Sequence, residues 1–241
     1  MHFRYEKVRT ITNLLEPQRI RHTAPVENVR FLPCGYKHGN DLPDPATMRP
    51  FTVGNRFGEG NDSHAWFYLH VTRPAAMAGA EMYLRVGTEF NGWDADKPQF
   101  IAYVDGVMRQ GLDINHTDLL LEGKDEFDVW LYAYTGQLIP SAEFRASLIS
   151  IDRDVEKLYY DLLFPRQVME FLSQDSVEYA TILKHLDHAV DLLDLREVPS
   201  ENFYHSIHKT NTYLTTTFYK NYYHPQKTTI ISIKHTHINY T

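Results

Sequence analysis

The spacing of apolar residues changes near residue 150, and this change limits the folds that the chain can adopt. Before that point, short segments alternate apolar and polar residues or are rich in aromatic and β-branched residues. After it, apolar residues recur at intervals of three and four. The first pattern is typical of β-strands with one buried face, and the second of amphipathic helices. The sequence therefore predicts an α+β protein in which a β domain precedes helices.

The β domain is expected over residues 1–150. Segments with the strand pattern recur at regular spacing, at residues 65–71, 81–86, 100–104, 127–134 and 144–151. Asp105-Gly106 directly follows the third of these and is a strong hairpin signal. Residues 20–60 are rich in Pro, Gly, Asn and Asp and are interpreted as turns and loops. Short strands joined by turns indicate an antiparallel β-sandwich, jelly-roll-like in type.

A helical linker segment is expected over residues 151–225. Its first helix starts at Ile151, and Pro165 is expected to interrupt it, because a proline inside a helix removes a hydrogen bond. Ser200 is a candidate N-cap for the third helix. Residues 226–241 then contain one short apolar strand. A lone strand of this kind needs neighbours, so we expect it to be the first strand of an incomplete α/β barrel.

Composition excludes several classes of function. The net charge is −7 and no block of Lys and Arg occurs, which argues against nucleic acid as a partner. Cys34 is the single cysteine, so no internal disulfide can form and a reducing compartment is expected. The N-terminal segment is charged, unlike a signal peptide, and no apolar run approaches the ~20 residues that span a bilayer. We therefore expect a cytoplasmic protein with no membrane partner.

Three stretches, at residues 100–117, 150–161 and 233–239, resemble parts of glycoside hydrolase family 38 α-mannosidases of the cytosolic and bacterial type. Residues 100–117 are similar to a signature in the N-terminal β domain of that family, and residues 150–161 to the start of its linker helices. Residues 233–239 are similar to the family's GHTHID motif, where the first strand of the catalytic barrel ends. The three stretches occur in the family's order and roughly at its spacing.

The resemblance implies a metal-dependent, retaining hydrolase of terminal α-linked mannose in oligosaccharides. In such enzymes a zinc or similar divalent ion contacts the sugar, and two carboxylates act as nucleophile and general acid. The first metal ligands of the motif correspond to His237 and Asn239. Lys234 stands where the motif has Gly, and Asn239 stands where it has the ligand Asp. The catalytic residues belong to a barrel that is absent here, so we expect no catalytic residue, no bound metal and no hydrolysis by this chain alone.

Several residues have a simpler interpretation beside the functional one. His237 and the neighbouring His235 could belong to a polar tail. Trp93, in a predicted loop, is the candidate for sugar contact, although packing against another domain explains it as well. Trp66 and Trp130 are expected in the sandwich core.

Other interpretations of the chain as a whole also stay open. The segment around Asp113 and His116 could bind a metal or sugar, or simply fix a tight turn. The whole chain could instead be a stand-alone carbohydrate-binding module or a domain that assembles homo-oligomers.

Overall fold

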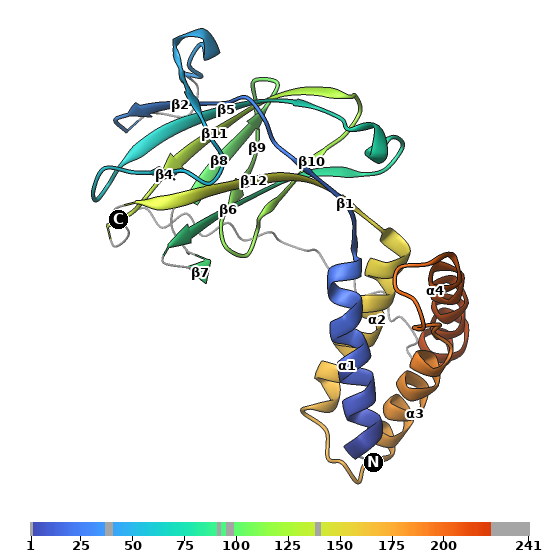
Figure 1. Cartoon of the computed structure of the whole chain (residues 1–241). Helices are drawn as coiled ribbons and strands as arrows, with labels where there is room; N and C mark the ends of the chain where they lie inside the picture. The colour runs from blue at the N-terminus through green and yellow to red at the C-terminus, as the bar shows by residue number, and fades with distance from the viewer. Residues whose placement is uncertain (1, 37–40, 91–92, 95–98, 138–140, 223–241) are drawn as a thin grey trace. The chain divides into compact units, whose positions relative to one another are not determined.

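The computed structural model describes residues 2–36, 41–90, 93–94, 99–137 and 141–222. Of these, the residues up to Arg21 and those from Ile151 onward form a helical unit, and His22–Ser150 form a β unit (Figure 1). This arrangement confirms the predicted α+β class with antiparallel sheets. The expected lone strand within 226–241 lies outside the described residues.

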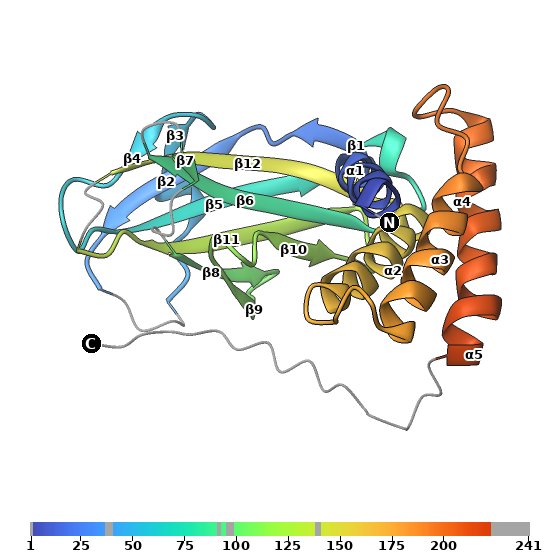
Figure 2. The same cartoon turned by 90° about the horizontal axis from the view of Figure 1, so that it is seen from below.

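Within its described residues, the β unit contains two six-stranded sheets (Figure 2). Sheet I contains, in spatial order, β1 (Ile20–Pro25), β12 (Ala142–Ile151), β6 (Met82–Phe90) and β10 (Asp118–Leu121), with β4 (Arg56–Phe57) beside β12 and β7 (Trp93–Asp94) beside β6. Sheet II contains, in order, β3 (Arg49–Phe51), β2 (Val29–Cys34), β5 (His64–Thr72), β11 (Glu126–Tyr134), β8 (Gln99–Val104) and β9 (Val107–Leu112). Every neighbouring pair in sheet II is antiparallel. Two short 3₁₀ turns, η1 (Pro45–Thr47) and η2 (Ala75–Met77), lie in the connections.

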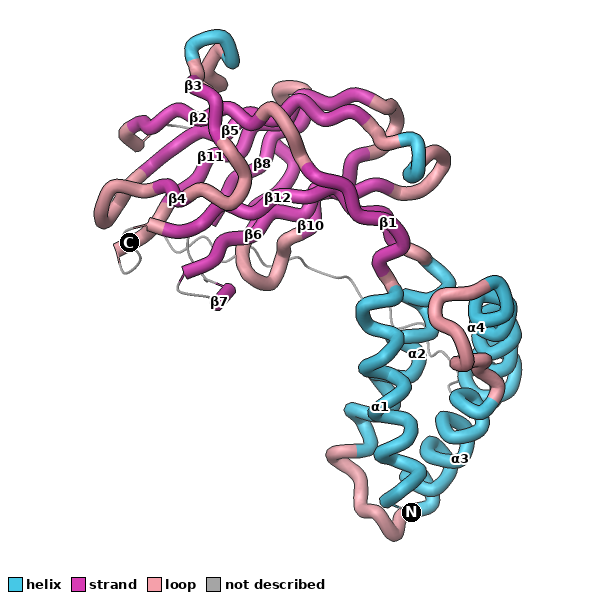
Figure 3. The backbone as a smooth tube through the Cα atoms, in the orientation of Figure 1, coloured by secondary structure: helices cyan, strands magenta, loops and turns pink. Residues whose placement is uncertain are grey.

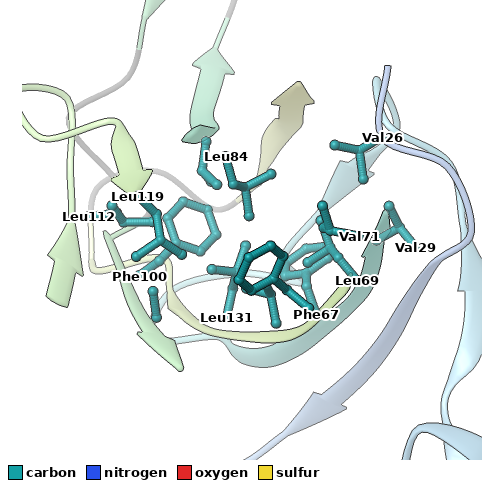
Figure 4. Close-up of a cluster of buried hydrophobic side chains, with 14 of the residues drawn as sticks. Val26, Val29, Phe67, Leu69, Val71, Leu84, Phe100, Leu112, Leu119 and Leu131 are labelled. Atoms are coloured by element: carbon teal, nitrogen blue, oxygen red, sulfur yellow. The ribbon is translucent and has the colours of Figure 1, made fainter. Parts of the chain in front are cut away.

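The core of the β unit lies between the sheets and is built from alternate residues of each strand (Figure 4). On β5, Phe67 and Leu69 point inward and are completely buried. Phe67 stacks on Phe144 of β12 with ring centroids 4.2 Å apart, so the two sheets meet through an aromatic pair. Because the side-chain period of a strand is two, the residues between these point to the opposite face of the sheet.

Residues 20–60 differ from the expectation, because the described part of this segment contains four strands rather than turns alone. Pro33 lies within β2 and pairs with Ala65 of β5. The β3 pairing covers β2 only as far as Phe31 among the described residues, so Pro33 removes no donor from that ladder. A proline is tolerated at such an edge, which explains why the strand was hidden in a Pro- and Gly-rich segment.

The helical unit consists of α1 (His2–Gln18), α2 (Arg153–Met169), α3 (Val177–Asp191) and α4 (Glu201–Tyr213), followed by a π-helical stretch (Leu214–Tyr219) and α5 (Lys220–Tyr222) (Figure 3). Ser200 caps α4 as predicted, because its side chain accepts a hydrogen bond from the backbone N–H of Phe203. The helices share one apolar core, to which α1 contributes Val8 and Leu15. No helix among the described residues is long and apolar enough to cross a membrane.

Two features of the helical unit differ from the expectation. The first is α1, which lies in the segment assigned to the sandwich domain 1–150 but belongs to the helical unit. Only Val8, Thr12 and Leu15 of α1 are buried, and such a sparse apolar face gives a weak periodic signal. The second is Pro165, which lies inside α2 without ending it. Pro165 itself is buried with the apolar face, and this packing offsets the missing hydrogen bond.

The β unit is inserted between α1 and α2 in the sequence. Both of its ends adjoin the helical unit, where the backbone N–H of Asp152 donates a 2.8 Å hydrogen bond to the carbonyl of Arg19. The side chain of Asp152 then caps α2 by accepting from the N–H groups of Asp154 and Val155. Arg21 donates to the same carboxylate at 3.2 Å. One aspartate therefore joins the residues before and after the inserted β unit.

Candidate functional site

The residues predicted from the GHTHID-like stretch lie outside the described part of the chain. His235, His237 and Asn239 all fall within 223–241, so their expected metal role stays a prediction. Trp93 is described in its backbone, which pairs with Phe90 of β6, and not in its side chain. Within the described residues, no group of three His, Cys, Asp or Glu side chains could hold a metal ion.

The Asp113 segment forms a closed turn between β9 and β10. Oδ1 of Asp113 accepts 2.8 Å hydrogen bonds from the backbone N–H groups of Asn115 and His116 and lies 2.9 Å from Nδ1 of His116. Partial burial raises the pKa of Asp113, but the hydrogen bonds from His116 and Asn115 outweigh it and the net pKa is lowered. A carboxylate engaged in this way fixes the turn. The geometry favours the conformational interpretation of this segment.

Trp66 and Trp130 lie in an aromatic cluster on the outer face of sheet II, whereas they were expected in the sandwich core. Trp66 lies opposite Tyr132, and Trp130 lies between Tyr68 and Tyr103. Trp66 is only 2% exposed, because Met48 and neighbouring side chains pack over this face. Strand alternation explains the difference, since Phe67 occupies the core position and its neighbour must point outward.

A polar network borders this aromatic cluster at one end. The hydroxyl of Tyr68 donates to Oδ1 of Asp128 at 2.7 Å, and Nδ1 of His70 lies 2.9 Å from the same oxygen. Burial, followed by the bond to Asp128, raises the pKa of Tyr68 to about 12. Hydrogen bonds from His70 and Tyr68 lower the pKa of Asp128. Tyr68 therefore stays protonated near neutral pH and cannot act as a base there.

His64 lies at the other end of the same face, within a group of tyrosines. Its Nδ1 is 2.8 Å from the hydroxyl of Tyr132, and its ring stacks on Tyr134 at 4.9 Å. Tyr134 in turn donates a 2.6 Å hydrogen bond to Asp62, and Tyr36 approaches the imidazole edge-on at 5.8 Å. Burial lowers the pKa of His64 despite the opposing charge of Asp62. The imidazole is therefore neutral near pH 7.

A pocket of about 280 Å³ opens beside His64, where β2 extends beyond β3. We call it the His64 pocket, and its lining includes Phe31, Phe57, Arg49, Arg56, Glu59, Ser63 and His64. The two phenylalanines belong to the buried core and are each only 4% exposed, so they contribute little surface to the pocket. The lining also includes a carboxylate, two guanidinium groups and a hydroxyl, whereas the imidazole of His64 packs against Tyr132 and Tyr134 on the outer face of sheet II. The pocket therefore combines hydrogen-bond donors and acceptors of both charges.

Two of the polar groups in the His64 pocket are held in place by the protein. Nη2 of Arg56 donates to the carbonyl oxygen of Ser141 at 2.8 Å and contacts its hydroxyl at 3.1 Å. Ser63 donates to the carbonyl of Gly60 at 2.9 Å and accepts from the backbone N–H of Glu59 at 3.1 Å. These bonds shape the loop on which Glu59 lies.

Arg49 and Glu59 have a different status from the other charged groups of the pocket. Both are exposed, and among the described residues no carboxylate pairs with Arg49 and no cation pairs with Glu59. The guanidinium of Arg49 instead lies 5.2 Å from the ring centre of Phe31. Opposite charges therefore line one pocket without neutralising each other, and both can form hydrogen bonds to a ligand.

Sequence reasoning did not identify the His64 pocket. Its residues come from β2, β3 and the start of β5 in sheet II, from β4 in sheet I and from the loop before β5, so their proximity depends on the pairing within sheet II and on the packing of the two sheets. One signal was visible in the sequence, where Gly58 and Gly60 flank Glu59. In the structure these two glycines adopt φ angles of 94° and 111°. Such angles favour glycine, so this glycine pattern shapes the loop that presents Glu59.

The comparisons with known proteins identify no family. No family model matches the chain, and no curated protein matches it. A crystal structure of a "putative beta-galactosidase" from Bacteroides fragilis is similar at 13% identity and a TM-score of 0.32. The match covers 54% of this chain and 23% of that chain, so the present chain spans less than a quarter of that protein. A likeness at this level supports no conclusion about activity.

Proposed function

We propose that the chain corresponds to the N-terminal, non-catalytic region of a family 38 α-mannosidase. One observation carries the proposal: three stretches resemble that family in its own order along the chain. The complete enzymes of the family hydrolyse terminal α-linked mannose with a divalent metal and two carboxylates. In this proposal the present chain supplies a scaffold for that chemistry and no catalytic group.

The first stretch, residues 100–117, builds part of sheet II and its connection to sheet I. It covers β8, β9 and the Asp113 turn, and its Asp105-Gly106 pair forms the hairpin between the two strands. Both turn residues have positive φ angles, 51° and 81°, as a type I′ turn requires. The family-like residues of this stretch therefore have a structural use, which agrees with a scaffold role.

The second stretch, residues 150–161, joins the β unit to the helices. It contains the end of β12, the capping residue Asp152 and the first half of α2. The third stretch, with His237 and Asn239, lies outside the described residues. By the resemblance these two would contribute to a zinc site, and we derive no catalytic step from them.

Two experiments test this proposal. Sequencing the DNA that follows codon 241 should reveal a reading frame, in phase or shifted, that encodes a barrel with the remaining metal ligands. A downstream region with no such frame would contradict the proposed ancestry.

Purified chain should also fail to hydrolyse an aryl α-mannoside in the presence of zinc. Hydrolysis that is lost on chelation and restored by zinc would contradict a non-catalytic role.

A further inference from the structure

We propose that the last described part of the helical unit docks on α3 through His185 and detaches when that imidazole gains a proton. We call residues 214–222 the docking segment. It consists of the π-helical stretch Leu214–Tyr219 and α5, and it continues directly from α4 (Figure 2). This inference uses only the packing of the helical unit and does not depend on the proposed family.

The docking segment has a weak helical preference of its own. Thr215–Thr217 are three consecutive β-branched residues, which lose side-chain freedom in a helix. Oγ1 of Thr216 donates a 2.8 Å hydrogen bond to the carbonyl of Thr212, and such back-bonding slightly destabilises a helix. Leu214 and Phe218 are the buried residues of the segment. Its stability therefore depends on contacts with other helices.

His185 of α3 lies at the centre of these contacts. Its side chain is only 7% exposed, and its Nδ1 is 2.8 Å from the hydroxyl of Tyr213, the residue before the segment. Its ring centre lies 5.4 Å from that of Phe218 and 5.0 Å from that of Tyr222. One imidazole therefore contacts the chain at the start, middle and end of the docking segment.

The neighbours of His185 on α3 do not favour a positive charge. Burial lowers the pKa of His185, and the charges of Lys184 and His188 lower it further. Among the described residues, no carboxylate pairs with this imidazole. Asp187 of the same helix is paired with Lys7 of α1 instead.

The elements packed against the imidazole supply no counter-charge either. Tyr213 of α4 and Tyr222 of α5 present phenol groups, which are uncharged near neutral and at mildly acidic pH. Burial raises the pKa of Tyr213, so its phenol stays protonated. A protonated imidazole here would be a buried charge without a partner, which is costly in free energy. Detachment of the segment returns that charge to water.

Contacts between the docking segment and α2 do not share this sensitivity to pH. Nζ of Lys157 lies 3.2 Å from Oγ1 of Thr215, and the hydroxyl of Tyr219 donates to the carbonyl of Asp161 at 2.9 Å. Ammonium and phenol groups keep their protons between pH 5.5 and 7.5. These contacts contribute to docking at both pH values, and His185 makes it depend on pH.

Hydrogen exchange of the whole chain at pH 7.5 and 5.5, followed by mass spectrometry and corrected for intrinsic exchange rates, tests the proposal. At pH 5.5 an exposed imidazole with a pKa of about 6.5 is protonated roughly ten times more often than not. Protection of peptides that cover residues 214–222 should therefore fall by up to about tenfold more than protection of α1. An equal loss in α1, or no loss in the docking segment, would overturn the proposal.

Variants and a titration identify the group that responds. His185→Gln cannot gain a proton, so its docking segment should be protected equally at both pH values. His208→Gln, at an exposed position of α4, should respond as wild type does. An NMR titration of wild type covers the case in which His185→Gln does not fold. Protonation of His185 should coincide with the loss of protection, and a segment that detaches while His185 is still neutral would overturn the proposal.

Discussion

Arg85 of β6 and Asp118 of β10 form a two-point ion pair, with Nε 2.6 Å from Oδ1 and Nη2 2.7 Å from Oδ2. The two residues lie directly opposite each other in the register of sheet I. The bond to Asp118 raises the pKa of Arg85, despite partial burial. This pair connects β10, a strand of four residues, to the rest of the sheet.

Asp118→Asn should lower the free energy of unfolding by about 1 kcal/mol, because it removes the anionic partner of a partly buried bidentate pair. Arg85→Lys keeps the charge and loses the planar fork, so it should also destabilise the β unit. Urea unfolding of both single variants and the double variant measures the coupling. Strictly additive effects would show that the pair contributes nothing.

The turn between β8 and β9 provides a test of backbone conformation alone. Gly106 has a φ angle of 81°, and a Cβ placed there would meet no atom within 4 Å. Gly106→Ala should therefore destabilise the protein by about 1 kcal/mol through its strained conformation. Gly87→Ala is the matched control, because Gly87 also has open space but no positive φ angle. Thermal melting should be lowered by the first substitution, and equal melting of the two variants would contradict this reasoning.

The cap of α2 should contribute measurably to the stability of the helical unit. Asp152→Ala removes the acceptor for the N–H groups of Asp154 and Val155 and should cost about 1 kcal/mol. Asp152→Asn keeps a capping oxygen and loses only the ion pair with Arg21, so we expect a smaller loss. Far-UV circular dichroism during urea unfolding measures both. A larger loss for Asn than for Ala would argue against capping as the main role.

His185 makes the stability of the helical unit depend on pH. Its Nδ1 lies 2.8 Å from the hydroxyl of Tyr213, and its ring contacts Phe218 and Tyr222. Burial lowers the pKa of His185, and the nearby charges of Lys184 and His188 lower it further. Below about pH 6.5 the unfolded chain therefore binds a proton that the folded chain resists, and the free energy of unfolding falls as the pH falls.

Urea unfolding at pH 7.5 and 5.5 checks this expectation on wild type and on His185→Gln. The variant should lose less stability than wild type over this interval, although it is less stable at both pH values because the tyrosine contact changes. His208→Gln, at an exposed position of α4, should keep the wild-type pH dependence. The same pH dependence in wild type and His185→Gln would exclude His185 as the source.

The sequence predicted the elements whose pattern is local. β5 and β11 were visible because their aromatic and β-branched residues extend over nine residues each. β10 was not, because its four residues, Asp-Leu-Leu-Leu, show no alternation. α1 was missed because most of its surface is polar and only one narrow face is buried. Local patterns therefore identified long elements and missed short or mostly exposed ones.

The candidate site was less predictable than the fold. Trp66 and Phe67 are adjacent large aromatic residues, and sequence alone does not decide which of them faces the sandwich core. Arg49 and His64 come together only because β2 lies between β3 and β5, a pairing that depends on contacts across the whole sheet. The metal and sugar contacts expected at His237 and Trp93 stay predictions, since those side chains lie outside the described residues.

The insertion of the β unit between α1 and α2 affects how the chain can fold during synthesis. A ribosome releases α1 first, but α2 follows only after all of His22–Ser150 has been made. Domains generally fold as units while the chain emerges, so the sandwich can complete its folding before the helices that pack against α1 have been made. During that interval the apolar side chains of α1, including Val8 and Leu15, are exposed to chaperones and to other nascent chains. α1 is thus made before the whole β unit and is buried only after it.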